Sequence, residues 1–210
     1  MSNYQPPYSC LHLLGPVAAM FAAGRVNEVH QRFHGAHFIG TCPGGELFFE
    51  SNLELDTDGS TFHKQDKTGQ SGTALSGPGG KGVDANAVPF IVLPLRSFGH
   101  WGINLGHMAM VIHNGRMSAA IFADHGPENK LGEGSIELHR RLGYERIHQG
   151  ILSNRGITGR VLTFVFPRSG THKTQPVQAI EAVARQRWRQ MAIEQASLQP
   201  GHVSTPVSLG

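Results

Sequence analysis

The sequence predicts a mainly β protein with a single core, and three observations support this prediction. The chain of 210 residues is long enough for one well-buried domain with appendages and too short for two large ones. Glycine is abundant, with 27 residues, and only 16% of residues are charged, which suits a fold with many turns better than a helical bundle. Apolar runs of strand length recur through the middle of the chain. We divide the chain into a helical arm (1–40), a β-rich domain (41–170) and a C-terminal helix with a tail (171–210).

The arm contains apolar residues at helical intervals. These intervals, over residues 11–33, predict one or two short helices. His30, His34 and His37 have a spacing that would place three imidazoles on one helical face, as a metal site requires. Gly35 should end such a helix before His37, so we expect a solvated histidine face instead. We predict no metal and no other cofactor.

The N-terminal region also bears on localisation. Residues 11–23 form an apolar run, but no basic residue precedes it and Gly15-Pro16 interrupts it, so we do not expect a cleaved signal peptide. The run is too short to span a bilayer, and we expect a soluble protein. Cys10 and Cys42 allow at most one disulfide, and whether they pair stays open.

The first strand of the β-rich domain is expected at residues 47–55, where β-favouring side chains partly alternate with polar ones. It is followed by Asp56 and Asp58, which we interpret as carboxylates that reach into a cleft. The pattern also mimics the opening of an EF-hand calcium loop. Position twelve of that loop would be Gln65, however, which cannot supply the bidentate carboxylate that calcium needs.

A glycine- and serine-rich loop at residues 67–84 follows, and its low hydrophobicity predicts that it is mobile. Two interpretations stay open: closure over a substrate, or a plain surface connection. Residues 89–95 are a continuous apolar run bounded by prolines, which indicates a buried strand. Trp101 then lies in a glycine-flanked loop, where its ring can stack on a sugar or pack into the core.

The strongest local signal is a hairpin. Residues 106–113 and 117–123 are apolar segments joined by Asn114-Gly115, a pair that favours a two-residue β-turn. The hairpin places Asp124 at its far end, where a rigid strand would hold the carboxylate. A last strand is expected at residues 160–166.

A second carboxylate follows nine positions later. Glu133 opens a helix-like run between Gly132 and Gly134, and these two glycines leave room for another molecule to approach. Asp124 and Glu133 can therefore form an acid and base pair. The alternative is that Asp124 starts a turn and Glu133 favours the positive end of a helix.

The C-terminal segment at residues 176–198 is predicted to be an amphipathic helix that carries Arg185, Arg187 and Arg189. Its apolar face can pack on the β-rich domain, form a dimer or hold a protein partner. The arginines do not lie in a recognisable nucleic-acid-binding fold, so we expect no nucleic-acid partner.

Residues 121–143 read IFADHGPENKLGEGSIELHRRLG. This segment resembles the catalytic signature of the fungal-type chitosanases of glycoside hydrolase family 75, which is a strand, Asp-Thr-Gly-Pro, a short loop, Ile-Gly-Glu-x-Ser and a helix. His125 stands where the family usually has Thr, and Leu131 replaces an Ile. Residues 55–59 and 88–94 resemble the family's Asp-rich strand end and proline-bounded strand, so the likeness covers about residues 47–166. The residues that match the signature are Asp124, Gly126, Pro127, Gly132, Glu133 and Ser135.

The resemblance implies a six-stranded double-psi β-barrel with short N-terminal helices and the C-terminal helix appended to it. It also implies an enzyme of class EC 3.2.1.132, an endo-acting hydrolase that cleaves β-1,4 bonds of chitosan with inversion, and makes residues 41–170 the catalytic domain. We assign Glu133 as the acid, because apolar neighbours at Leu131 and Ile136 can desolvate it, and Asp124 as the base. The residues expected to bind substrate are Asp56, Asp58, Trp101, His125 and Ser135.

Two alternatives to chitosan cleavage stay open. The formal charge of +3 suits an anionic polymer, and certain peptidoglycan lytic transglycosylases are thought to share the fold, so a peptidoglycan-cleaving enzyme is the second interpretation. The third is an inactive protein that binds a glycan, or a partner through the C-terminal helix. Family 75 enzymes are typically secreted, which here would require export without a cleaved signal.

Overall fold

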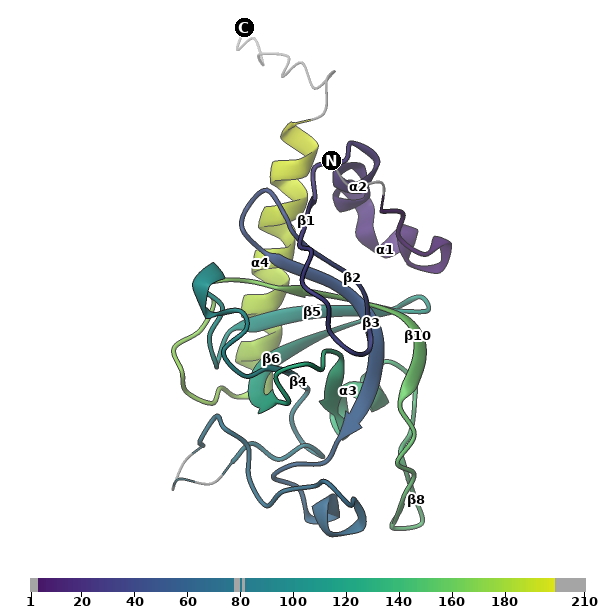
Figure 1. Ribbon diagram of the computed structural model, residues 1–210, viewed down its shortest axis with the longest axis vertical. Helices are drawn as coiled ribbons and strands as arrows, with labels where there is room; N and C mark the ends of the chain where they lie inside the picture. Colours follow the sequence, from purple (N-terminus) through teal and green to yellow (C-terminus); the bar gives the residue numbers. More distant parts are fainter. Residues whose placement is uncertain (1–3, 78–79, 81, 199–210) are drawn as a thin grey trace, which may run out of the picture.

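The centre of the molecule is a closed β-barrel of six strands, seen in the computed structural model in Figure 1, which describes residues 4–77, 80 and 82–198. Around the barrel the order is β3, β10, β5, β6, β4 and β7, and β7 pairs again with β3 to close it. The chain is therefore mainly β, as predicted. The strands are β3 (Leu47–Asp56), β4 (Phe90–Pro94), β5 (Met108–His113), β6 (Arg116–Gly126), β7 (Glu133–Ser135) and β10 (Ile157–Val165).

Each barrel wall is buried on both faces. Phe48 and Phe49, neighbours in β3, belong to two different apolar clusters, because successive side chains of a strand point to opposite faces. This explains why several strands are continuous apolar runs in the sequence. Outside the barrel, β1 (Asn27–Glu28) and β2 (Ala36–Thr41) extend the sheet from β3, and β8 (Ile147–His148) pairs with β9 (Ile151–Leu152).

The predicted hairpin is confirmed by β5 and β6, which are antiparallel and joined at Asn114 and Gly115. Both turn residues have positive φ, 44° and 77°, as a type I′ turn requires. β6 continues to Gly126, three residues further than expected. Asp124 therefore lies inside the strand rather than at its end, and it pairs with Val92 of β4.

The short helices of the arm form only in its first part, at α1 (Leu11–Leu14) and α2 (Ala18–Ala22), with flanking 3-10 turns η1 (Tyr8–Cys10) and η2 (Gly15–Val17). The helical expectation beyond Ala22 is wrong. The amide of Val29 donates to the carbonyl of Ile39, so backbone groups that a helix would use pair with a strand instead. Because His37 lies in β2, the three histidines share no helical face.

Two further helices lie in the second half of the chain. The helix α3 (Ile136–Arg141) begins after Ser135, whose side chain caps it, so Glu133 opens strand β7 and not a helix as expected. The helix α4 (Val177–Ser197) confirms the predicted C-terminal helix and packs its apolar face on the barrel. Among the described helices, none has the length and hydropathy needed to cross a bilayer.

One core connects the three parts of the chain. The larger apolar cluster joins Leu14 and Phe21 of the arm to Phe48 of the barrel and to Ile180 and Met191 of α4. Cys10 and Cys42 are both buried and both free thiols.

Candidate active site

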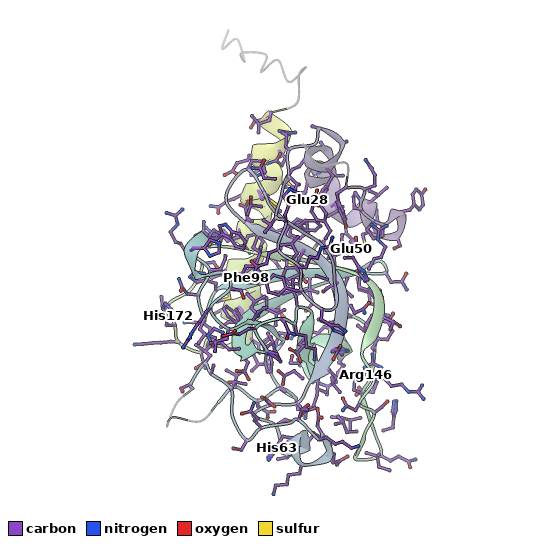
Figure 2. The ribbon with its side chains drawn as sticks, in the orientation of Figure 1. Glu28, Glu50, His63, Phe98, Arg146 and His172 are labelled. Atoms are coloured by element: carbon purple, nitrogen blue, oxygen red, sulfur yellow. The ribbon has the colours of Figure 1, made fainter. Side chains whose placement is uncertain are left out.

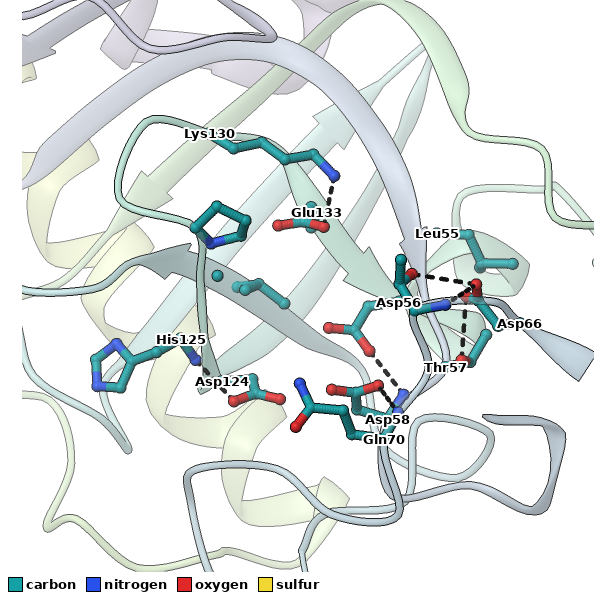
Figure 3. Close-up of a pocket in the computed structure, with 14 residues that line it drawn as sticks. Leu55, Asp56, Thr57, Asp58, Asp66, Gln70, Asp124, His125, Lys130 and Glu133 are labelled. Carbon is teal, nitrogen blue, oxygen red and sulfur yellow. Dashed lines mark hydrogen bonds and ion pairs between the residues drawn. The ribbon is translucent and has the colours of Figure 1, made fainter. Parts of the chain in front are cut away.

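An acidic pocket of about 340 Å³ opens at one end of the barrel, where β3, β4, β6 and β7 meet the loop that follows β3 (Figure 3). Among the described residues that line it, Lys130 is the one lysine or arginine. The pocket is therefore acidic although the whole chain carries a formal charge of +3. Its carboxylates are Asp56, Asp58, Asp66, Asp124 and Glu133.

Strand pairing explains why Asp124 and Glu133 reach the same pocket. Val92 in β4 is the register partner of Asp124 in β6 and also of Glu133 in β7. The two acidic residues therefore stand at one level on the two strands that flank β4. Neighbouring strands lie about 4.8 Å apart, so the two backbones are separated by about 10 Å.

Asp124 is held by backbone donors on one side. Its side chain is buried, with 7% exposure, and its Oδ1 atom accepts hydrogen bonds from the amides of Ala74, at 2.9 Å, and His125, at 2.7 Å. Burial raises the pKa of the Asp124 carboxyl, while the two amides oppose that rise by stabilising the anion. The Leu75 amide bonds the Ala123 carbonyl, so this part of the 67–84 loop is anchored at the site.

Asp56 and Asp58 complete a compact group with Asp124, since each of the three contributes an oxygen within 4.8 Å of the other two. Burial raises the pKa of Asp56 to about 8, with a further rise from the Asp58 charge. Burial likewise raises the pKa of Asp58 to about 6. The Asp58 and Asp124 carboxyls also act on each other, and their interaction raises the pKa of Asp58 and lowers that of Asp124. The same spacing would admit a divalent cation.

Glu133 occupies a different environment. Its Oε1 atom lies 2.8 Å from the ammonium of Lys130, which also pairs with Glu54 at 2.7 Å. Leu131 and Ile136, the apolar neighbours that we expected to desolvate Glu133, are buried in the core. The charged partner of the Glu133 carboxylate is Lys130, which the sequence analysis did not identify. A Cβ atom at Gly126 would lie 2.6 Å from Oε2 of Glu133, so only glycine leaves space for the carboxylate there.

The glycines beside Glu133 serve packing and not access. A Cβ atom on Gly132 would lie 2.2 Å from the carbonyl oxygen of Asn52, and one on Gly134 would lie 2.8 Å from the Leu138 side chain. The protein's own chain therefore fills the space that we expected another molecule to use.

Comparison with known proteins adds no relative. A scan against models of protein families matches none of them, and a search of curated proteins finds no significant similarity. A functional proposal therefore rests on the chemistry of the pocket and on the positions of the motif residues.

Two residues expected to bind substrate lie outside the acidic pocket. Ser135 is fully buried, and its hydroxyl accepts from the amides of Phe90 and Leu138 and donates to the Val88 carbonyl. It thus joins β4 to the start of α3, and we assign it a structural role. Trp101, in the 3-10 turn η5 (Gly99–Trp101), stacks on Phe98 with ring centroids 5.2 Å apart.

The remaining expected residues, Asp56, Asp58 and His125, do line the pocket. Sequence reasoning missed Asp66 and Lys130. Asp66 follows the 3-10 turn η3 (Thr61–Gln65), and its carboxylate accepts from the Thr57 hydroxyl at 3.2 Å. Nothing in the local pattern marks Asp66. Lys130 stands three positions before Glu133, but this spacing predicts an ion pair only within a helix, and Glu133 opens strand β7.

Proposed function

We propose that this protein is an endo-acting glycoside hydrolase that cleaves β-1,4 bonds of chitosan with inversion, as the family 75 chitosanases do. The observation that carries the proposal is the placement of Asp124 and Glu133 on the two strands that flank β4, at one level and in one acidic pocket. Under this proposal the six-stranded barrel is of the double-psi kind.

The separation of the two residues suits inversion. Backbones about 10 Å apart, with side chains that project into one pocket, fit carboxylates separated by about 6.5 to 9.5 Å. That separation leaves room for a water molecule between one carboxylate and the sugar. A retaining enzyme would need the carboxylates about 5 to 5.5 Å apart.

In the proposed reaction Glu133 protonates the glycosidic oxygen as the bond to the anomeric carbon breaks. Asp124 removes a proton from a water molecule, which attacks the anomeric carbon from the opposite face and inverts its configuration. The amides of Ala74 and His125 support the anionic form of Asp124 that this role needs. Lys130 holds the Glu133 side chain in place.

The charge of the pocket favours chitosan over peptidoglycan. Protonated glucosamine units are cations, and the described residues of the pocket offer them five carboxyl groups against one lysine. Asp56, with its pKa of about 8, is protonated near neutral pH, and the other four carboxyl groups still outnumber the lysine. Muropeptides carry carboxylates, which such a pocket would repel. The local field therefore outweighs the net charge of +3, which had favoured an anionic polymer.

The test is to incubate the full chain with chitosan oligomers and, separately, with muropeptides, and to identify the products by mass spectrometry. We expect shorter glucosamine oligomers and intact muropeptides. Glu133→Gln and Asp124→Asn should each lower turnover of chitosan by about a thousandfold, because each removes one proton-transfer group.

Glu128→Gln is the matched control, since Glu128 is exposed in the turn between β6 and β7, five positions before Glu133, and does not line the pocket. It should leave turnover unchanged. Cleavage of muropeptides alone, or full turnover of chitosan by Glu133→Gln, would refute the proposal.

A further inference from the structure

A second pocket, of about 240 Å³, adjoins the acidic one and shares His125 with it. It lies where the end of β4 and the segment that follows face β6. Phe98 and His172, which both line it, lie on the same side of the barrel in Figure 2. Most of the wall is apolar and comes from Leu93, Pro94, Leu95, Phe98, Ile103, Leu105 and Phe122.

The second pocket differs from the first in charge. Of the residues that the structure describes, no aspartate or glutamate lines it, and Arg96 is its one permanently charged lining residue. A protonated amine would meet a guanidinium and apolar side chains there, with no carboxylate to neutralise it. An uncharged group with an apolar end fits these walls better.

His125 stands in the wall between the two pockets. Figure 3 shows its imidazole directed away from the Asp124 carboxylate. The ring contacts the edge of Phe122, with centroids 5.2 Å apart, and its Nδ1 atom is buried without a hydrogen-bond partner among the described residues. A buried nitrogen with no partner is costly, and a rotation of the ring would bring it to a bound group that supplies one.

We propose that the second pocket is a subsite for the acetamido group of an N-acetylglucosamine unit next to the glucosamine unit held in the acidic pocket. The methyl group would pack on Leu93 and Phe122, and the amide would bond to His125. Arg96 would disfavour an ammonium group at the same position. This inference rests on the proposed function, and it makes the substrate a glucosamine chain acetylated at a defined position.

A larger side chain at Gly99 can fill the second pocket. Gly99 lines the wall, and a Cβ atom there would meet no atom within 4 Å. Its φ is not in the left-handed region, so Gly99→Leu should fold normally while its side chain occupies the space for the acetyl group. His100→Leu is the matched control, because His100 is exposed in the same turn and does not line the pocket.

Binding is measured by titration calorimetry with the full chain carrying Glu133→Gln, so that the sugar is not consumed. The two probes are glucosamine tetramer and the same tetramer with one N-acetyl group at an internal position, each position in turn. One acetylated tetramer should bind about tenfold tighter than the unacetylated one, because it buries a methyl group and gains a hydrogen bond. Gly99→Leu should abolish this preference and leave binding of the unacetylated tetramer unchanged, and His100→Leu should keep both.

Equal affinity for all tetramers would overturn the inference, as would a Gly99→Leu variant that weakens all of them equally. Failure of the proposed function has a separate signature. In that case the wild-type chain hydrolyses none of the tetramers, whatever the calorimetry shows.

Discussion

Asp124 and Glu133 differ in their hydrogen-bond partners, and we propose different roles for them in catalysis. A substrate whose leaving group needs no protonation distinguishes the acid from the base. An aryl leaving group such as 4-nitrophenol departs without a proton, so it does not need a general acid. Glu133→Gln should therefore keep activity on a 4-nitrophenyl chitooligosaccharide within about tenfold of wild type, although its chitosan activity falls by about a thousandfold. Asp124→Asn should lose activity on both substrates, as followed by nitrophenol release. The reverse pattern would exchange the two roles.

Asp56 links the pocket to stability. Its pKa rises from an ordinary value near 3.8 to about 8 in the fold, so between these values the folded state holds a proton that the unfolded state has lost. Stability is then fully present below the unfolded value and decreases as the pH rises through the folded value. Asp56→Asn should remove this dependence and raise the free energy of unfolding at pH 8 by on the order of 3 kcal/mol.

Urea denaturation at pH 5 and pH 8 checks this expectation, with Glu128→Gln as an exposed carboxylate control that should keep the wild-type pH dependence. Should Asp56→Asn be no more stable than wild type at pH 8, burial of the ionised Asp56 carboxylate would not cost the free energy that its raised pKa implies. A pocket that holds such a cluster costs stability, which is typical of functional sites.

Four of the five carboxylates of the pocket could be predicted because strands and a short motif position them, whereas Asp66 could not. Asp56 ends β3 and Asp58 follows it, while Asp124 and Glu133 keep the motif spacing. Lys130 was missed because its ion pairs with Glu133 and Glu54 depend on how β7 docks on β3.

At the scale of elements, local periodicity predicts the long strands and the helix α4, while pairing between distant segments decides the rest. The three residues of β7 are too few to show a pattern, and they form a strand only because they pair with β3 on one side and with β4 on the other. The extended segment at β1 has the same cause, since Asn27 pairs with Thr41 and Glu28 with Gly40 of β2. Neither partner can be recognised from the segment's own sequence.

The turn of the β5–β6 hairpin allows a prediction about the element that carries Asp124. Gly115 has φ of 77°, and a Cβ atom there would meet nothing closer than 3.7 Å, so Gly115→Ala should cost backbone strain alone. We expect a loss of about 1 kcal/mol in the free energy of unfolding. Gly143 would be a poor comparison because Arg116 crowds it, whereas Gly99→Ala adds a Cβ in open space and should change stability little.

Urea denaturation of both variants measures the difference. Specific activity on chitosan at 25 °C should be unchanged in Gly115→Ala, because the turn lies at the far end of β6 from Asp124. Equal stability of Gly115→Ala and wild type would mean that the turn relaxes without left-handed geometry.

At the scale of the whole molecule, the arm and the C-terminal helix are parts of the core. Amphipathic spacing indicates that one face of a helix is covered, but it cannot identify what covers it, so the sequence left packing, dimerisation and partner binding open for α4. In the structure α4 contacts β5 and β6, and its buried residues join the barrel's larger apolar cluster. Figure 1 shows α4 running along the barrel wall.

Two isoleucines of α4 test whether this helix unfolds together with the barrel. Ile180 is fully buried and Ile193 is 68% exposed, so the same substitution can be made at a packed and at a solvated position. Ile180→Ala should lower the free energy of unfolding by about 2 to 4 kcal/mol and keep a single cooperative transition, because the cavity opens in the shared core. Ile193→Ala should change it by less than about 0.5 kcal/mol. Thermal and urea denaturation, followed by near-ultraviolet circular dichroism, measures both effects. An unchanged barrel transition in Ile180→Ala would mean that α4 is an appendage whose apolar face binds a partner instead of the core.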